Sequence, residues 1–281
     1  MDKFEVIENF KCYAPELAFE SRDYSPEFFE KMFALEENNF WFQARNRILR
    51  GLFEKFIGKD KHANILEIGV GTGYVIKELS LIKNFQLCGG ELHISGLRFA
   101  RKRLPEVEFI QLDATRMPFE NEFEAVGAFD VLEHVDKDIE VMQGVYRSLK
   151  AGGLFFITVP QHKFMWSEQD EGAYHKRRYS RREMLDKLKL SNYKIEFVSS
   201  FVTILFPLMF LSRWSVLKKH PPKSGIDYKT NEVEYNFEEL KISPLVNTIS
   251  GLLMRFDEMC LKMGWSLPFG GSLAVVARKI D

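Results

Sequence analysis

Glycine recurs at every second position in one segment of the chain, and this spacing is its clearest sign of chemistry. The segment ILEIGVGTGYV, residues 65–75, contains a single acid, Glu67. Three glycines follow this acid, at Gly69, Gly71 and Gly73. Glycine has no Cβ atom, so the backbone can turn sharply and touch a ligand directly. A carboxylate two residues before the first glycine suits a ligand with a cationic group.

Two more acids end strand-like runs downstream of these glycines. Glu91 ends FQLCGGE and precedes Leu92, and Asp113 ends VEFIQLD and precedes Ala114. In an open sheet of parallel strands, ligands bind beyond the carboxyl ends of the strands. A carboxylate there can accept hydrogen bonds from both hydroxyls of a ribose. We therefore expect Glu91 to bind a ribose, with a solvated loop acid as the alternative.

Three histidines are candidates for a general base, namely His134, His162 and His175. Neutral histidine can accept a proton near pH 7, which suits this task. His162 comes just after the apolar run GLFFITVP, where a strand would reach the ligand edge of a sheet. All three positions are compatible with a base, and the pattern does not choose between them.

The segment YHKRRYS carries side chains that could hold an anion. Arg177, Arg178 and Tyr179 follow one another here. Arginine pairs well with carboxylate and phosphate groups. We expect these three residues to bind an anionic group of the substrate. The alternative is a salt-bridged loop that only caps a helix beginning near Ser180.

The elements that position these residues can be read from the alternation of short apolar runs and amphipathic segments after Asn64. Strands are expected in NILEIG, FQLCGGEL, VEFIQLD, FEAVGAFDV and GLFFITVP. Helices are expected between them, in YVIKELSLI, SGLRFARKRL and KDIEVMQGVYRSLK. A β-α-β-α order predicts an α/β, Rossmann-like, doubly wound parallel sheet with right-handed crossovers. The glycines and the acids then meet at one edge of that sheet.

Three regions are expected along the chain. Residues 1–60 should form an N-terminal helical lid, with one helix near residues 40–57. Residues 61–200 and 271–281 should form the α/β domain. Residues 201–270, which contain LFPLMFL and LVNTISGLLMRF, should form a helical insert before the last strand. Because these two runs are apolar, the insert is expected to cap and wall a hydrophobic pocket.

The segment LEIGVGTGY resembles the nucleotide-binding motif of class I S-adenosylmethionine-dependent methyltransferases. The resemblance covers about residues 64–160, where LKAGGLFFITVP is also typical of the family. It implies a mostly parallel seven-stranded sheet whose last strand is antiparallel. It also implies S-adenosyl-L-methionine as cofactor and S-adenosyl-L-homocysteine as product.

The resemblance further implies which residues bind this cofactor. In the family, an acid at the place of Asp113 takes the adenine amino group, and the amide at Ala114 meets the ring. Phe129 and Asp130 stand where relatives line the sulfonium end, and an aromatic face or carboxylate favours positive sulfur. The cofactor-binding residues expected on strands and loops are Glu67, Gly69, Gly71, Gly73, Tyr74, Glu91, Leu92, Asp113, Ala114, Phe129 and Asp130.

The N-terminal run NNFWFQARNRIL resembles a lid segment of the same relatives. Trp41 and Arg45 are four residues apart and therefore share one face of a helix. The resemblance implies that Arg45 meets the methionine carboxylate while Trp41 covers the sulfur. The alternative is a helix packed on the domain with Arg45 in solvent.

LEHV, residues 132–135, is similar to a segment of quinone-pathway O-methyltransferases. Glu133 and His134 could act on substrate, could bind a divalent metal with Asp130, or could be structural, with His134 under the cofactor. Adjacent positions on one turn rarely close a metal site alone, so no metal is expected. YHKRRYS resembles the element GHxRRY found after the fifth strand in bacterial relatives, with Tyr174 in place of its glycine.

Composition and charge exclude other classes of function. The chain has 281 residues and a net charge of −1, so it has no overall attraction for nucleic acid, and no nucleic-acid partner is expected. Three scattered cysteines, Cys12, Cys88 and Cys260, are too few for a disulfide framework or a zinc site. The start MDKFEVIENF lacks the apolar run of a signal peptide, so a cytoplasmic location is expected.

Residues 197–219 leave two interpretations open. No charge occurs from Phe197 to Ser212, but a spanning helix needs about 20 apolar residues and Pro207 interrupts this one. One interpretation is a core strand that runs into a buried helix. The other is a peripheral membrane contact, or a wall for a greasy substrate, with Trp214 at the interface.

Together these patterns predict an enzyme that methylates oxygen or nitrogen of a small, partly hydrophobic or lipid-linked acceptor. A protein that binds S-adenosylmethionine without transfer activity, as a sensor or scaffold, is the first alternative. A dinucleotide oxidoreductase is the second, but the third glycine of its G-x-G-x-x-G fingerprint would fall at Tyr74. The oligomeric state is not indicated.

Overall fold

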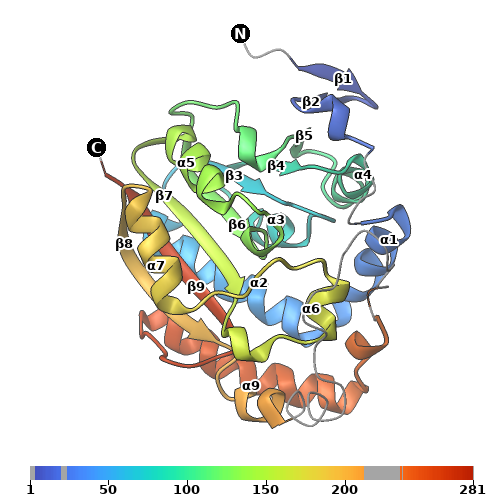
Figure 1. The fold of residues 1–281 in the computed structure, drawn as a ribbon, viewed down its shortest axis with the longest axis vertical. Helices are drawn as coiled ribbons and strands as arrows, with labels where there is room; N and C mark the ends of the chain where they lie inside the picture. Colours follow the sequence, from blue (N-terminus) through green and yellow to red (C-terminus); the bar gives the residue numbers. More distant parts are fainter. Residues whose placement is uncertain (1–3, 20–23, 212–234, 236, 281) are drawn as a thin grey trace.

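The computed structural model describes residues 4–19, 24–211, 235 and 237–280, and a nine-stranded sheet forms its centre (Figure 1). The strands follow the order β1-β2-β5-β4-β3-β6-β7-β9-β8 across the sheet. Their bounds are β1 Glu5–Ile7, β2 Phe10–Cys12, β3 Ala63–Ile68, β4 Phe85–Glu91, β5 Glu108–Gln111, β6 Phe123–Phe129, β7 Leu149–Pro160, β8 Tyr193–Phe201 and β9 Ser272–Lys279.

The direction of the strands confirms the predicted doubly wound sheet. Strands β3 to β7 run parallel to one another, whereas β9 runs antiparallel to both β7 and β8. The chain builds outward from β3 to β5 and then returns to place β6 on the other side of β3. In such a sheet the ligand crevice lies where the winding reverses, beyond the carboxyl ends of β3 and β6.

The first residues of the chain form a hairpin, which corrects the prediction of a wholly helical segment 1–60 and of seven strands. Glu8 and Asn9 both have positive φ angles, 51° and 63°, as a two-residue hairpin turn requires. Strand β2 then pairs parallel with β5. Gln111 anchors the segment after the hairpin. Its side chain accepts a hydrogen bond from the amide of Ala14 and donates one to the carbonyl of Ala14.

Helices cover both faces of the sheet. Figure 1 shows α5 and α7 in front of the strands and α2 behind them. Ile65 packs into the core on the α2 side, whereas Leu66 and Ile68 pack into the core on the α5 side. The helix bounds are α1 Pro26–Leu35, α2 Phe40–Phe53, α3 Tyr74–Leu79, α4 Ile94–Arg103, α5 Asp138–Ser148, α6 Glu168–Gly172, α7 Arg181–Leu190 and α9 Pro244–Met263.

The N-terminal helices begin as the sequence indicates. The Ser25 hydroxyl accepts from the amide of Phe28 ahead of α1, and the Asn39 side chain accepts from the amide of Trp41 ahead of α2. These caps satisfy amides that a helix start leaves without partners. Helix α2 continues into a wider turn that ends at Gly58, whose φ is 96°. The predicted helix near residues 40–57 is thus confirmed.

The insert between β8 and β9 packs against α2 through α9. Arg47 of α2 donates to both carboxylate oxygens of Glu258, at 2.6–3.0 Å. Residues 197–201 belong to β8 and residues 206–211 are helical, whereas 212–219 and most of the predicted loop 218–236 lie outside the described residues. Within the ranges that the structure describes, no helix is long and apolar enough to cross a membrane.

Candidate functional site

The glycine segment forms a tight loop between β3 and α3, at the switch point of the sheet. Gly69, Gly71 and Gly73 have φ angles of 67°, 53° and 80°, which side chains other than glycine rarely accept. A Cβ atom on Gly69 would lie 2.4 Å from Val131, whereas one on Gly71 would meet no atom within 4 Å. The backbone at Gly71 therefore borders open space in which a ligand can approach.

Glu67 lies directly under this open space. Residues alternate between the faces of a strand, so Glu67 shares the α2 side of β3 with Ile65. The carboxyl group is buried, and its Oε2 atom has no hydrogen-bond partner. Burial raises the pKa of Glu67 well above its usual range, while the nearby Arg45 opposes the shift. A buried carboxyl group with a bare oxygen is a site that a cationic ligand can satisfy.

Glu91, at the end of β4, holds the other side of the glycine loop. Its carboxylate accepts from the amide of Gly71 at 2.9 Å and from the amides of Leu92 and His93 at 2.8 and 3.2 Å. These bonds leave acceptor capacity free, because a carboxylate has about four lone-pair sites. Glu91 thus lies against the glycine loop, and its role with a ribose stays a prediction.

The N-terminal helices close over the same loop. Arg103 of α4 donates to the Glu36 carboxylate at 2.6 Å and to the carbonyl of Thr72 at 2.9 Å. The Thr72 hydroxyl also bonds to Glu36, and the ion pair is almost completely buried. An atom at the Cβ position of Gly96 would lie 3.0 Å from Phe29 and 3.1 Å from the Gly71 carbonyl oxygen. Helix α1 thus covers the loop.

Arg45, from α2, lies over the end of β6. Its Nη1 atom donates to Asp130 at 2.7 Å, and its guanidinium stacks 4.8 Å from the ring centroid of Trp41. The alternative of a solvent-exposed Arg45 is therefore wrong, because only 9% of its side chain is exposed. Asp130 has a φ of 56°, a backbone strain of the kind that concentrates at functional sites.

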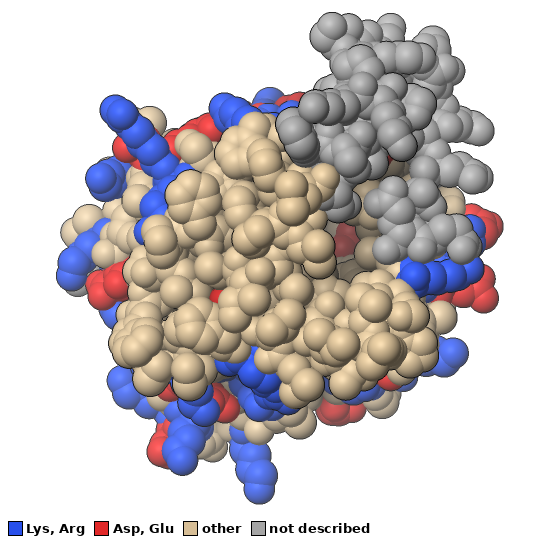
Figure 2. Space-filling view, turned by 90° about the horizontal axis from the view of Figure 1, so that it is seen from below, with Lys and Arg blue, Asp and Glu red and all other residues tan. Residues whose placement is uncertain are grey.

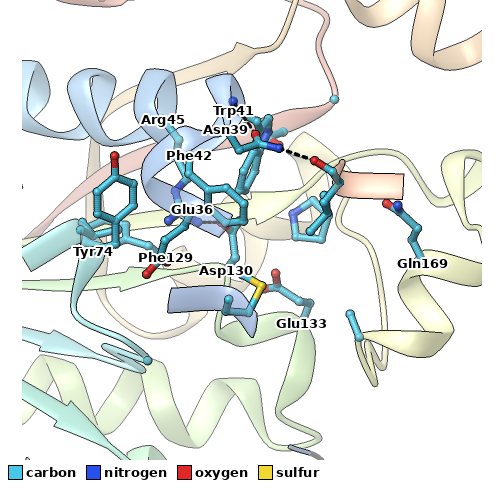
Figure 3. A pocket seen from close by; sticks show the side chains of 18 of the residues that line it. Glu36, Asn39, Trp41, Phe42, Arg45, Tyr74, Phe129, Asp130, Glu133 and Gln169 are labelled. Atoms are coloured by element: carbon cyan, nitrogen blue, oxygen red, sulfur yellow. Dashed lines mark hydrogen bonds and ion pairs between the residues drawn. The ribbon is translucent and has the colours of Figure 1, made fainter. Parts of the chain in front are cut away.

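One cavity of about 650 Å³ is lined by Gly69, Gly71, Glu36, Glu67, Arg45 and Asp130 among others, whereas Glu91 lies behind the glycine loop (Figure 3). Figure 3 shows Tyr74 and Glu36 toward one end, Trp41 and Phe42 in the middle, and Glu133 and Gln169 toward the other end. Among the described residues, five carboxyl groups but only two guanidinium groups line the cavity. The acids are Glu36, Glu67, Asp130, Glu133 and Asp170, and the bases are Arg45 and Arg178.

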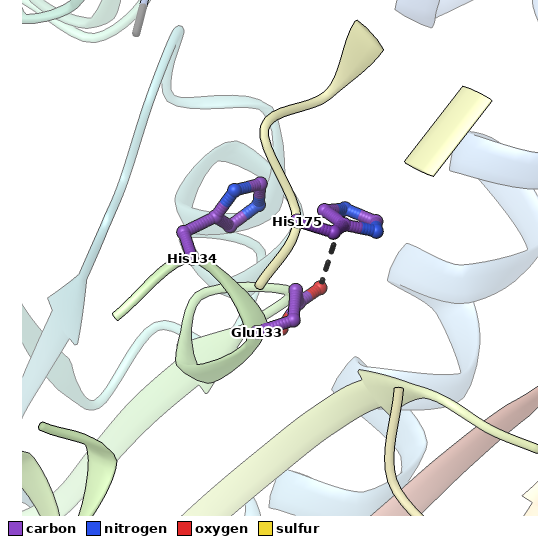
Figure 4. A group of neighbouring side chains, drawn as sticks. All are labelled: Glu133, His134 and His175. Carbon is purple, nitrogen blue, oxygen red and sulfur yellow. Dashed lines mark ion pairs between the residues drawn. The ribbon is translucent and has the colours of Figure 1, made fainter. Parts of the chain in front are cut away.

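The far end of the cavity holds Glu133, His134 and His175 (Figure 4). Both carboxylate oxygens of Glu133 are buried without a hydrogen-bond partner, and Oε1 lies 4.0 Å from Nε2 of His175. Burial and the charge of Asp130 raise the pKa of Glu133 well above its usual range. Burial and the neighbouring His175 lower the pKa of His134 to about 3, so His134 is neutral near pH 7.

Asp170, in the first turn of α6, orients His175. Its Oδ1 atom lies 2.8 Å from Nδ1 of His175 and accepts from Arg178 at 2.7 Å. These partners hold the pKa of Asp170 well below its usual range although burial opposes them. An ionised carboxylate only accepts, so Nδ1 of His175 carries the proton and Nε2 keeps its lone pair. That lone pair can accept a proton in the cavity.

Part of this chain matches a known protein family. A model of the methyltransferase domain matches residues 66–157, from the glycine strand to the end of the parallel sheet. Residues 66–157 thus match a domain of the class I S-adenosylmethionine-dependent methyltransferase type. The matched span contains Glu67, the three glycines, Glu91, Asp113, Asp130 and Glu133.

Relatives of this methyltransferase family are distant. A Mycolicibacterium smegmatis protein named probable S-adenosylmethionine-dependent methyltransferase is 22% identical over 58% of this chain and 62% of its own length. Demethylmenaquinone methyltransferase of Chlorobaculum tepidum is 27% identical over 48% of this chain and 54% of its own length. The chain thus spans somewhat more than half the length of these curated relatives.

Solved structures share the fold of the family over most of the chain. Phosphoethanolamine N-methyltransferase 2 of Haemonchus contortus, in complex with S-adenosyl-L-methionine, aligns with a TM-score of 0.58 at 18% identity. The match covers 92% of this chain and 58% of that chain. At this identity the match establishes the α/β architecture, and the chemistry must be argued from the site.

Several residues predicted for the methyltransferase site do not reach the cavity. His162 is stacked among Phe164, Phe206 and Phe269, with ring centroids 5.0–5.4 Å apart. Arg177 pairs with Asp138 at 3.2 Å. Tyr179 is fully buried in the core and donates to Leu132 and Asp138. Of the predicted anion-binding trio, the structure brings only Arg178 to the cavity wall.

The predicted adenine contacts lie beyond the cavity. Asp113 follows β5, and its carboxylate accepts from the amide and hydroxyl of Thr115 and from Arg116 at 2.7–2.9 Å. Ala114 begins the short turn after it. Glu91 and Leu92 lie between this turn and the glycine loop, because β4 pairs with β5 on one side and β3 on the other.

Sequence patterns missed residues that complete the site. Asp170 and Ser167 form a capping box, so this acid looks like an ordinary helix start in the sequence. Tyr24 precedes α1, where its hydroxyl donates to the Ala173 carbonyl at 2.7 Å and lies 3.2 Å from Nδ1 of His134. Nothing in the sequence around Glu36, apart from its charge, indicates that it belongs to the site. Each becomes visible only when segments far apart in the chain meet.

The donor set of Glu133, His134 and His175 could hold a divalent cation, because one ligand atom from each lies within 4.8 Å of the others. The alternative set raised by the sequence included Asp130, but the structure pairs Asp130 with Arg45 and brings His175 beside Glu133 instead. Two imidazoles and one carboxylate are ordinary ligands of transition metals. The same arrangement also serves proton transfer without a metal.

Proposed function

We propose that this chain transfers the methyl group of S-adenosyl-L-methionine to oxygen or nitrogen of a small, partly hydrophobic or lipid-linked acceptor. The observation that carries the proposal is the cavity itself. It joins a glycine loop of positive φ and the bare Glu67 carboxyl to an oriented histidine at its far end. One end suits the cofactor and the other suits an acceptor that must lose a proton.

The cofactor fits the proposed end through charge and shape. The bare oxygen of Glu67 suits the ammonium of the methionine part, and Arg45 suits its carboxylate. Trp41, Phe129 and Asp130 then surround the positive sulfur. Glu91 with Leu92 would take the ribose, Asp113 with Ala114 the adenine, and Tyr74 would border the loop. Gly69, Gly71 and Gly73 admit the adenosyl group to the backbone.

The transfer step is an in-line displacement. Bound S-adenosyl-L-methionine would supply its methyl group to a lone pair of the acceptor, and the sulfur would keep the electrons of the broken bond in the neutral thioether S-adenosyl-L-homocysteine. The proton of the acceptor passes to Nε2 of His175, whose other nitrogen is held by Asp170. His134 is the second candidate base in the cavity, but Tyr24 occupies its Nδ1 atom. Alignment of the two reactants supplies much of the rate.

The acceptor class follows from the walls of the cavity. Apolar side chains from the insert and from α1 face it, including Met32, Leu205, Met209 and Ile242. Such walls favour an acceptor with an apolar body, and Arg178 could attract an anionic group on it. The relatives named as demethylmenaquinone methyltransferases are consistent with an acceptor of this kind.

Calorimetry with S-adenosyl-L-methionine, followed by transfer of a labelled methyl group to a panel of quinols, phenols, amines and polyprenyl-linked compounds, tests the proposal. Saturable binding with labelled product is the expected result. Binding without any labelled product would favour a cofactor-binding protein that acts as a sensor or scaffold. Binding of NAD without binding of S-adenosyl-L-homocysteine would favour an oxidoreductase. The cytoplasmic location remains part of the proposal, and cell fractionation tests it.

A further inference from the structure

Helix α9 turns an apolar face to the outside of the molecule. Its inner stripe, which includes Ser250, Met254, Asp257 and Leu261, is buried. Leu245 and Leu252, on the outer side, are 70% and 66% exposed. The apolar side chains of α9 that are exposed are Leu245, Val246, Ile249, Leu252, Leu253, Phe256, Met259 and Met263. The expected role of LVNTISGLLMRF as a pocket wall is therefore wrong for most of its apolar residues.

The charges of α9 are sorted by sign between the two faces. The exposed charged residues of this helix are Arg255 and Lys262, both basic. Its acids lie on the inner side, where Asp257 accepts from the amide of Thr203 at 2.8 Å and Glu258 binds Arg47. Glu258 also pairs with Arg255 at 2.9 Å, whereas Lys262 has no ion pair within the described residues. A helix facing water would ordinarily carry its polar residues outward. This helix presents apolar side chains edged by positive charge instead.

The apolar area extends from α9 onto its neighbours. Leu208, Phe210 and Leu211 are exposed on the helical residues 206–211, and Phe210 packs 6.0 Å from the exposed Phe164. Trp265 and Phe269, after α9, are exposed as well. Figure 2 looks at this side of the molecule and shows a wide area without charged residues. We call the exposed apolar residues of α9, 206–211, Phe164, Trp265 and Phe269 the α9 surface.

The α9 surface is continuous with the cavity of the candidate site. Leu208 is 68% exposed and also lines the cavity, and Ser250 of α9 lines it from the inner stripe. Figure 2 shows the molecule hollowed beside the uncharged area, with an acidic side chain visible inside. Among the described residues, Leu208 therefore joins the α9 surface to the cavity with an apolar side chain.

We propose that the α9 surface docks this protein on an anionic lipid bilayer, with α9 lying in the plane of the interface. Exposed apolar areas of this kind mark interaction sites, and apolar faces edged by lysine and arginine suit anionic membranes. Trp265 at the end of the helix is a side chain typical of the bilayer interface.

Flotation of the purified full-length protein with vesicles of equal parts phosphatidylcholine and phosphatidylglycerol tests this inference. The wild type should float with the vesicles, and the double variant Leu252→Glu, Met259→Glu should bind at least about tenfold more weakly, because it places two charges in the interface. The matched control is Leu190→Glu, since Leu190 is 76% exposed at the end of α7, outside the α9 surface. This control should float like the wild type.

The outcomes separate the inference from its rivals. A wild type that stays unbound, or a double variant that floats equally well, would overturn the docking proposal. Sedimentation velocity reports self-association, and a wild-type dimer that the double variant dissociates, with no flotation of either, would make the α9 surface a dimer interface. Neither measurement needs cofactor or acceptor, so the inference stands or fails independently of methyl transfer.

Discussion

The two ends of the cavity are built from different parts of the chain. At the glycine end, the end of β3 and the backbone of residues 69–72 come from one stretch of sequence, and α1 and α2 then cover them. At the far end, Glu133 follows β6, Asp170 and His175 come from the segment after β7, and Tyr24 precedes α1. Local backbone geometry specifies the first end, whereas contacts between distant segments create the second.

This difference suggests that the two ends can be disabled separately. A change of backbone at the glycine end should abolish cofactor binding and leave the far end intact. A change of side chain at the far end should slow transfer and leave cofactor binding intact. The following experiments test that separation, from the largest expected effect to the smallest.

Replacing Gly71 with valine should have the largest effect. A Cβ at φ 53° is strained and projects into the open space beside the loop, so cofactor affinity should fall at least about a hundredfold. Calorimetry measures the Kd. Gly152→Val is the matched control, because Gly152 also has a positive φ, 69°, and no atom within 4 Å of a Cβ. The separation fails if both variants lose binding equally.

His175→Ala should slow methyl transfer by about 10²–10⁴-fold, as loss of a general base does, while the Kd for S-adenosyl-L-methionine stays unchanged. Single-turnover rates with the acceptor found in the panel give the measurement. His162→Ala should keep the wild-type rate, because His162 is packed among phenylalanines outside the cavity. A loss of rate in the His162 variant alone would restore that residue as the base.

Acid should destabilise the fold through the far end of the cavity. Burial lowers the pKa of His134 from 6.5 to about 3. Between pH 6.5 and 3, His134 is protonated in the unfolded chain but neutral in the folded chain. The free energy of unfolding therefore falls as pH drops from 6.5 toward 3. His134→Asn should remove on the order of a few kcal/mol of this pH dependence, measured by urea denaturation. An unchanged pH dependence would contradict the burial of a neutral imidazole.

Glu91→Ala should weaken cofactor binding by about 1–3 kcal/mol, because charge-assisted hydrogen bonds to the ribose are lost. Glu108→Ala serves as control, since Glu108 pairs with Lys11 on the exposed edge of the same sheet. Calorimetry again gives both values. Wild-type affinity in the Glu91 variant would refute its role with the ribose.

Treatment with EDTA should have the smallest effect on turnover. Proton transfer through His175 needs no metal, so turnover after EDTA should match that of the untreated protein. Metal content by mass spectrometry, before and after treatment, is the companion measurement. If turnover is lost and Mn²⁺ restores it in the wild type but not in Glu133→Gln, the far end of the cavity is a metal centre.

The sequence predicted the fold and the glycine end well because both depend on local patterns. A short apolar run around Leu66 and the glycines after Glu67 are enough to place a strand, a turn and a ligand edge. The caps at Ser25 and Asn39 also follow local rules. The hairpin at Glu8 and Asn9 was missed because its short strands are stabilised by the edge of β5, a contact that only the folded chain supplies.

The far end could not be predicted because equal residue types there have different surroundings. His162 and His175 carry the same imidazole, yet phenylalanines enclose one and Asp170 orients the other. Arg178 reaches the cavity while Tyr179, its neighbour, is buried in the core. Apolar residues of α9 likewise gave no sign of whether they face inward or outward, since both faces of the helix are apolar.

The excess of carboxyl groups along the cavity has a consequence for how charge is handled during turnover. In the proposed reaction, one unit of positive charge starts on the sulfonium beside Asp130 and ends as an imidazolium at His175, between Glu133 and Asp170. Carboxyl groups lie beside both the sulfonium site and His175, so a positive charge would be stabilised before and after the transfer. A buried positive charge would thus have a carboxyl group near it at every stage of the reaction.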